Sequence, residues 1–324
     1  MTGQVAARLP RAIAILGPTG SGKSALAMRI AARLPVEIIS VDSAQVYRGM
    51  DIGTAKPTLA ERSAVPHHLI DIREPEQVYS AGEFRADCLR LVHEISQRGR
   101  LPLLVGGTML YFRALFRGIA ELPVANQTVR EAIDERARRV GWPALHADLA
   151  ARDPASAARI HPNDAQRIQR ALEVLELTGR SLQEHWSEEV QPSSFGDWSV
   201  CVLQPSQREL LHEALTARLA AMIAGGLQQE VSELLARGTL SDDSPALRLV
   251  GYRQLLASCR GQESLDAAVQ KALFATRQLA KRQLTWLRSP GLLPDECRVT
   301  VCNPFDAATM EQITQVLIEA HQPP

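Results

Sequence analysis

The segment from Gly17 to Ser24 reads Gly-Pro-Thr-Gly-Ser-Gly-Lys-Ser, which has the spacing G-x-x-x-x-G-K-[ST] of a phosphate-binding loop. Its glycines let backbone N–H groups converge on phosphate oxygens, and the N-terminus of the following helix adds a positive partial charge. The Lys23 ammonium neutralises the terminal phosphate, and the Ser24 hydroxyl can hold Mg²⁺. The pattern therefore predicts a bound diphosphate or triphosphate, without deciding between them.

One carboxylate, Asp42, is expected at the end of a central strand, Val36 to Val41, close to this loop. Open parallel sheets bind ligands at the edge formed by the carboxyl ends of their strands. Asp42 could hold a metal-bound water there or act as a general base, and the alternative is a cap of the next helix. The signatures of ATP or GTP users are not clean. No N-K-x-D motif occurs, and the strand ending at Val105 runs into Gly106-Gly107 instead of an acidic residue.

The loop and Asp42 need a sheet to position them, and the chain has the pattern of one. Short apolar runs at 11–16, 36–41, 68–72 and 101–105 alternate with helix-length segments, which is typical of a parallel α/β sheet covered by helices. A run at 199–203 is expected to return to that sheet. The intervening stretch 124–195 is rich in Ala, Arg, Glu and Leu and is predicted to be an all-helical insertion, with 1–123 and 196–324 forming the core.

The composition is that of a globular protein. Hydrophobic residues make up 45% of the 324 residues and charged residues 22%. No apolar run approaches the roughly 18 residues of a membrane span, so we expect a cytoplasmic protein with no membrane partner. The 36 basic residues balance 36 acidic ones, which argues against an indiscriminate polyanion binder.

Neither the cysteines nor the paired histidines predict a metal site. The five cysteines include no C-x-x-C pair and are expected to pack as thiols in a reducing compartment. His67 and His68 would point to opposite faces of a strand, so packing or polar support is favoured over shared metal binding.

The segment from Ala267 to Arg288 contains five basic residues and no acidic one. On a helix, Arg277, Lys281 and Arg288 would lie within about 40° of one another and form a basic stripe. The alternative is an ordinary solvated helix face, which needs no partner.

Several longer blocks of the sequence carry a specific resemblance. They are GPTGSGKSALA from Gly17, ISVDSAQVYRGMDIGTAKP from Ile39, PHHLID from Pro66, LLVGGTMLYFRAL from Leu103, QRIQRALEVLELTGR from Gln166, LVGYRQL from Leu249 and ATRQLAKRQLTWLR from Ala275. In these blocks, in this order and over about residues 12–288, the chain resembles the tRNA dimethylallyltransferase (tRNA isopentenyltransferase) family of bacterial type. The tail from Ser289 onward shows no diagnostic pattern, and its Cys297, Cys302 and His321 lack zinc-ligand spacing.

The resemblance implies a P-loop NTPase-like core and a helical insertion that binds the tRNA anticodon stem-loop. It also implies that the loop holds dimethylallyl diphosphate instead of ATP, with Mg²⁺ as cofactor, and that the acceptor is the exocyclic N6 amine of the adenine 3′-adjacent to the anticodon. Because that amine loses a proton as its bond forms, Asp42 is the candidate general base. We expect the protein to act as a monomer.

The implied site residues form two sets. The diphosphate set is Gly17, Pro18, Thr19, Gly20, Ser21, Gly22, Lys23 and Ser24, with Ser24 on the metal and Arg218 as a further clamp. The tRNA set is Asp42, Ser43, Ala44, Gln45, Thr108, Arg130, Gln166, Arg167, Ile168, Gln169, Arg170, Arg248, Gly251, Tyr252, Arg253, Lys281, Arg282 and Arg288.

Simpler roles remain open for some of these residues. Thr108 could cap a helix, Arg167 and Arg170 could be a solvated pair, and Tyr252 could be a core residue. Arg218 could be a solvated helix arginine. Two other functions also remain open: a kinase that uses ATP at the loop, and a non-catalytic RNA-binding module in which Asp42 is only a cap.

Overall fold

The computed structural model describes residues 9–120, 122–187, 194–242 and 244–322. The chain forms two compact units, Met1–Arg117 with Pro192–Pro324, and Gly118–Gln191. The second unit begins at residue 118, six residues before the expected start at 124. It ends at residue 191, four residues before the expected end at 195. Residues 118–126 form no regular element in the described part, so the hydrophobic pattern gave no signal there to locate the boundary.

The larger unit is built on a sheet whose described strands all pair in parallel, in the order β3-β2-β4-β1-β5-β6. Their bounds are Ala12–Leu16 for β1, Val36–Val41 for β2, His67–His68 for β3, Leu101–Gly106 for β4, Trp198–Leu203 for β5 and Arg298–Cys302 for β6. The predicted parallel α/β sheet is confirmed, including the return of the chain at β5 beside β1.

One expectation about strands is wrong, and one strand was not expected. The strand expected at 68–72 is only His67–His68, because Leu69 and Asp71 take positive φ angles of 62° and 56° that end the extended backbone. The edge strand β6 was not expected. It pairs with β5 in the tail that lacked a diagnostic pattern, for example Val202 beside Val301.

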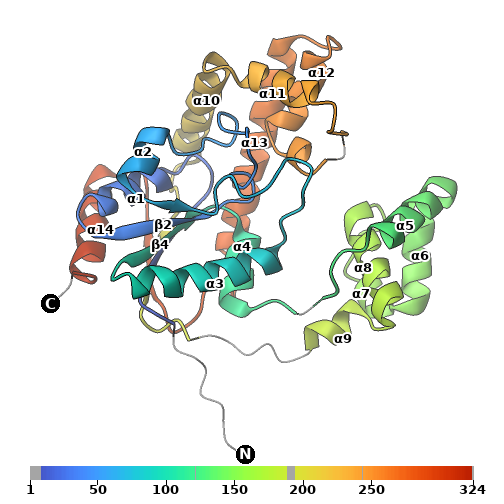
Figure 1. Cartoon of the computed structure of the whole chain (residues 1–324), viewed down its shortest axis with the longest axis horizontal. Helices are drawn as coiled ribbons and strands as arrows, with labels where there is room; N and C mark the ends of the chain where they lie inside the picture. The colour runs from blue at the N-terminus through green and yellow to red at the C-terminus, as the bar shows by residue number, and fades with distance from the viewer. Residues whose placement is uncertain (1–8, 121, 188–193, 243, 323–324) are drawn as a thin grey trace, which may run out of the picture. The chain divides into compact units, whose positions relative to one another are not determined.

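Alternate side chains of the strands face two separate hydrophobic clusters, as a sheet buried on both sides requires. On one face, Ile13 and Ile15 of β1 pack with α1 (Lys23–Ala31) and α14 (Ala307–Glu319). On the other face, Ala14 and Leu16 join a larger cluster with α3 (Ala81–Gln97) and α4 (Met109–Arg117). Figure 1 shows α1 and α14 on one side of β2 and β4 and α3 on the other.

Further helices of this unit extend the larger cluster beyond the sheet. They are α10 (Arg208–Ala224), α11 (Leu227–Ala236), α12 (Tyr252–Cys259) and the long α13 (Leu265–Leu287), with the short η1 (Ala246–Arg248) before α12. A short helix α2 (Leu59–Ala64) follows β2. No single described helix has both the length and the apolar composition to cross a membrane. Helices α10 and α11 have them only as a pair, bent by 57°.

The smaller unit is all-helical in its described part. Its helices are α5 (Gln127–Val140), α6 (Trp142–Arg152), α7 (Pro154–Ala157), α8 (Ala165–Thr178) and α9 (Leu182–Ser187). Ile133, Leu149 and Leu172 are fully buried in its own hydrophobic core. The Pro/Ser/Gly composition of residues 191–196 predicts a linker, of which the first half lies outside the described residues.

Candidate active site

The phosphate-binding loop connects β1 to α1, as the sequence predicts. Gly20 and Gly22 have φ angles of 78° and 76°, in the left-handed region that side chains other than glycine avoid. A Cβ atom at Gly20 would also lie 2.8 Å from the Leu215 Cδ2 atom of α10. Both glycines are therefore needed for the backbone shape of the loop, and Gly20 is also needed for its close contact with α10.

The loop already holds its lysine in place. The Lys23 ammonium donates a hydrogen bond of 2.7 Å to the Pro18 carbonyl oxygen. Burial lowers the pKa of Lys23 to about 8, while Asp42 opposes the shift and Arg218 adds to it. Arg218 is partly exposed, but desolvation by its neighbours lowers its pKa, and Asp42 again opposes the shift. The fold thus brings two predicted phosphate ligands and the predicted base within electrostatic range of one another.

Asp42 follows β2 directly and lies in a tight turn. Its Oδ1 atom accepts the backbone N–H of Ala44 at 2.9 Å, and the next described helix begins only at Leu59. The helix-cap alternative for Asp42 is therefore wrong. The neighbouring Ser43 donates its N–H to the Thr108 hydroxyl at 3.0 Å, which ties the end of β2 to the segment after β4. Thr108 uses its side chain for this tie, not as a cap of α4.

Two pockets meet at Asp42. The larger, with a volume of about 420 Å³, is lined at its polar end by Thr19, Asp42 and Arg218. The apolar part of its wall includes Leu215, Leu219 and Met222 of α10, Leu227 of α11, and Leu279 and Trp286 of α13, and further lining comes from the segments after β2 and β4 and from residues 248–252. The smaller pocket, of about 120 Å³, is lined by Lys23, Ser24, Ser40 and Asp42 among others. Asp42 therefore stands between a largely apolar cavity and a polar one that borders the predicted phosphate-binding loop.

The glycine at the end of β4, where an acidic residue was not found, has a steric cause. A Cβ atom at Gly106 would lie 2.0 Å from the carbonyl oxygen of Val41 on the neighbouring strand. Beside it, the Gln283 side chain of α13 donates to the Gly107 carbonyl at 2.8 Å and accepts the Thr19 N–H at 2.9 Å. Gln283 thus joins the phosphate-binding loop to the end of β4. Sequence reasoning did not single it out, because nothing local distinguishes it from a surface glutamine.

Comparison with known proteins gives a consistent answer for this architecture. Residues 45–290 match the family described as IPP transferase. The chain belongs to this IPP transferase family. It is 52% identical to the tRNA dimethylallyltransferase of Paraburkholderia phytofirmans, over 96% of this chain and 99% of that one. It is 53% identical to that of Methylococcus capsulatus, over 87% and 91% of the two chains.

Solved structures of the IPP transferase family have the same fold. The tRNA isopentenylpyrophosphate transferase of Bacillus halodurans superposes with a TM-score of 0.67 and 35% identity, over 96% of both chains. A eukaryotic dimethylallyltransferase acting on tRNA gives a TM-score of 0.79 and 27% identity, over 95% of this chain and 77% of that one. The resemblance to this family, predicted from sequence blocks, is confirmed.

In this IPP transferase, the other predicted RNA contacts of the larger unit fall into two groups. Arg248, Gly251 and Arg282 line the larger cavity together with Tyr252. Tyr252 is fully buried, so the core alternative holds for its ring as well. The second group, Arg253, Lys281 and Arg288, is exposed. Arg282 belongs to both groups, since it lines the cavity and is also exposed.

Gln45 has a local structural role in addition to any contact with RNA. Its side-chain amide donates to the Ala55 carbonyl oxygen at 3.3 Å, and its Oε1 atom accepts the Ser40 hydroxyl at 2.8 Å. It therefore supports the loop that follows Asp42 from the side of the sheet.

The predicted RNA contacts of the smaller unit differ in their accessibility. Gln166 and Arg167 are exposed, whereas the Ile168 side chain is fully buried in the core of the unit and offers no contact surface. Gln169 donates to Asp134 at 2.6 Å. The guanidinium groups of Arg130 and Arg170 both bind the fully buried carboxylate of Glu173, which keeps the pKa of Glu173 low despite its burial. These two arginines thus stabilise their own unit.

The histidines and cysteines serve the IPP transferase core. His68 contacts the Glu37 carboxylate at 2.7 Å and His67 the Val65 carbonyl at 2.7 Å, which is the expected polar support. Among the described residues, no group of three or more His, Cys, Asp and Glu side chains could hold a metal. The cysteines are free thiols, of which Cys201 and Cys302 lie 3.6 Å apart between β5 and β6.

Proposed function

We propose that this protein transfers the dimethylallyl group of dimethylallyl diphosphate to the N6 amine of the adenine 3′-adjacent to the anticodon in tRNA, and releases diphosphate. The observation that carries the proposal is the position of Asp42 between the phosphate-binding loop and an apolar cavity of about 420 Å³. The apolar part of this cavity wall is suited to a five-carbon prenyl chain beside its diphosphate. The relatives named above support the same reaction.

The loop and its basic neighbours are suited to the departing diphosphate. When the bond between the allylic carbon and the diphosphate oxygen breaks, the electron pair leaves with that oxygen. The backbone N–H groups of the loop, Lys23 and Arg218 would stabilise the added negative charge. Because Lys23 has a pKa of about 8, it carries its charge at neutral pH. The guanidinium fork of Arg218 can bind two phosphate oxygens at once.

The carboxylate of Asp42 is suited to the other end of the reaction. The adenine amine is a weak nucleophile, because its lone pair is delocalised into the ring. As the nitrogen–carbon bond forms, Asp42 would accept the proton that the amine loses, a role worth roughly 10² to 10⁴ in rate. The target base must leave its stack to enter the cavity, as in other enzymes that modify bases.

The proposed cofactor is Mg²⁺, and the residues present fit it. The Ser24 hydroxyl supplies an oxygen donor at the smaller, polar pocket. Magnesium keeps several waters and usually takes one or two protein oxygens together with substrate phosphates, so a larger protein cage is not required. The ion would supply charge neutralisation at the diphosphate.

The proposed RNA contacts are the exposed Arg253, Lys281 and Arg288 and the cavity-lining Arg248 and Arg282 of the larger unit, with Gln166 and Arg167 of the smaller one. Basic side chains on the surface bind phosphates and release counterions, so affinity should depend on salt. The monomeric state and the cytoplasmic location stay predictions.

The test is transfer of label from dimethylallyl diphosphate to unmodified tRNA in the presence of Mg²⁺. A control tRNA carries guanine in place of the target adenine and so lacks the N6 amine. We expect label in the first RNA and none in the second. Label on both RNAs, or phosphoryl transfer from ATP without prenyl transfer, would contradict the proposal.

A further inference from the structure

A buried carboxylate of α11 binds the loop that follows β2. The two oxygens of Glu230 accept the backbone N–H groups of Asp51 at 2.7 Å, Ile52 at 2.8 Å and Gly53 at 3.1 Å. Three successive N–H groups that converge in this way form a binding site for an anion. Here the protein fills that site with its own Glu230 side chain. Glu230 is buried, with 9% of its surface exposed.

A fourth hydrogen bond links the same carboxylate to the cavity wall. The Tyr252 hydroxyl donates to the Glu230 Oε1 atom at 2.6 Å, and burial together with Glu230 raises the pKa of Tyr252 well above its ordinary value. The ring of Tyr252 packs directly on Gly53, since a Cβ atom there would lie 2.6 Å from it. Glu230 therefore holds the backbone at Gly53 and the Tyr252 ring against each other.

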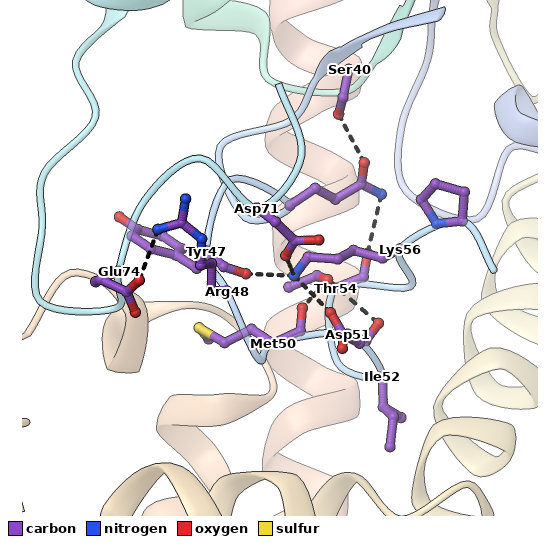
Figure 2. A network of polar contacts seen from close by, with 12 residues as sticks. Ser40, Tyr47, Arg48, Met50, Asp51, Ile52, Thr54, Lys56, Asp71 and Glu74 are labelled. Atoms are coloured by element: carbon purple, nitrogen blue, oxygen red, sulfur yellow. Dashed lines mark hydrogen bonds and ion pairs between the residues drawn. The ribbon is translucent and has the colours of Figure 1, made fainter. Parts of the chain in front are cut away.

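The other side of this loop is attached to the segment that follows β3. The Lys56 ammonium, whose side chain is 1% exposed, binds the Tyr47 carbonyl oxygen, Asp51 at 2.7 Å and Asp71 at 2.6 Å. Figure 2 shows this ammonium among the three groups. Lys56 thus fixes the loop to the core, and Glu230 fixes it to the helices that form the cavity.

The two groups held by Glu230 line the same cavity as Asp42. Gly53 and Tyr252 form part of its wall, and Asp42 and Arg218 part of its polar end. A base entering the cavity would be oriented by this wall relative to the Asp42 carboxylate. Misplacement by about 1 Å from the productive geometry can cost 10²-fold in rate.

We propose that Glu230 is a positioning residue for the transfer reaction: by joining Gly53 to Tyr252 it sets the orientation in which the acceptor amine meets Asp42. The inference rests on the function proposed above. Glu230 acts on the acceptor side of the cavity, whereas the diphosphate loop is positioned independently by its glycines and by Gln283. A purely structural role would lower stability without a selective effect on the chemical step.

The test compares Glu230→Gln with wild type in single-turnover transfer at saturating substrates. Glutamine keeps the size of the side chain, but its NH₂ group replaces one of the two oxygens and so opposes either the Asp51 and Ile52 N–H groups or the Gly53 N–H and the Tyr252 hydroxyl. We expect the rate constant to fall about tenfold or more in protein that circular dichroism shows to be folded, because the wall shifts. The KM for dimethylallyl diphosphate should change less than about threefold.

A matched control and a milder variant separate the outcomes. Glu233→Gln changes an exposed carboxylate of the same helix that bonds only Gln229 in the described contacts, and it should leave the rate at the wild-type value. Tyr252→Phe removes one of the four bonds and should cost about threefold to tenfold. Because both changes break the same contact, the Glu230→Gln, Tyr252→Phe double variant should be no slower than Glu230→Gln alone.

Each result decides between the possibilities. A wild-type rate in folded Glu230→Gln, or strictly additive losses in the double variant, would overturn the proposal. If Glu230→Gln does not fold, Tyr252→Phe decides alone, and a wild-type rate there would also overturn it. An inactive wild type would instead refute the proposed function, so the two failures are distinguishable.

Discussion

Replacing Asp42 with asparagine separates its proposed chemistry from its role in the turn. The turn depends on a hydrogen bond from the Ala44 N–H to the Asp42 Oδ1 atom, 2.9 Å long. An asparagine carbonyl oxygen can accept the same bond, so the free energy of unfolding should change by less than about 1 kcal/mol. The amide cannot take a proton from the acceptor amine, so the chemical step should be the part that suffers.

The expected loss in the chemical step is 10² to 10⁴-fold, or about 3 to 5 kcal/mol of transition-state stabilisation. The charge of Asp42 also raises the pKa of Lys23, so the variant should have a Lys23 pKa below its present value of about 8. Assays should therefore be run at about pH 6.5, where the ammonium stays protonated and diphosphate binding is preserved.

The assay is single-turnover transfer with saturating tRNA and dimethylallyl diphosphate, alongside thermal unfolding. Asp266→Asn, at an exposed carboxylate in the first turn of α13, is the matched control and should behave as wild type. A rate constant within about threefold of wild type in folded Asp42→Asn would refute the assignment of Asp42 as the base. A slow rate explained fully by loss of folded protein would refute it as well.

Three further outcomes are expected. Diphosphate affinity should fall as pH rises through about 8, because the free protein loses the Lys23 ammonium there and phosphate binds the charged form; Lys23→Arg should lack this fall in a calorimetric titration, since arginine stays charged. Replacing Lys281 and Arg288 with glutamine should lower tRNA affinity and reduce the slope of log Kd against log salt by up to about 1 per lost phosphate contact. An unchanged slope would show that both residues are ordinary solvated helix residues that do not contact RNA. Gly53→Ala should lower the free energy of unfolding by about 1 to 3 kcal/mol in denaturant titration, because its Cβ would lie 2.6 Å from the buried Tyr252 ring.

The elements with a local signal could be predicted from the sequence. The phosphate-binding loop needs glycines at fixed spacing, and the buried strands β1, β2 and β4 appear as short apolar runs between amphipathic helices. The strand expected at 68–72 shows where this reasoning fails. The apolar residues there have the pattern of a buried strand. In the folded chain, however, Asp71 has a left-handed backbone conformation and forms ion pairs with Lys56 and Arg62, and neither can be read from the local sequence.

Contacts between distant residues could not be predicted in the same way. Glu230 looks like an ordinary acidic residue on an amphipathic helix, and its partners lie 22 and about 180 positions away. Strand β6 is half exposed at the edge of the sheet, with Val299 and Val301 facing outward, so it lacks the pattern of a buried strand. Arg130 shows another limit: the family resemblance implied an RNA contact, and no local pattern indicated that its partner in the fold is the buried Glu173.

The hydrogen bond from the Lys23 ammonium to the Pro18 carbonyl oxygen has a consequence for the thermodynamics of ligand binding. A free lysine side chain has roughly 1.5 to 2 kcal/mol of rotamer entropy to lose when it is fixed. In this loop the 2.7 Å bond has already fixed it before any phosphate arrives. Preorganisation of this kind moves the entropic penalty from binding to folding. When a diphosphate binds, the Lys23 ammonium exchanges the Pro18 carbonyl oxygen for a phosphate oxygen, and its side chain needs little further ordering.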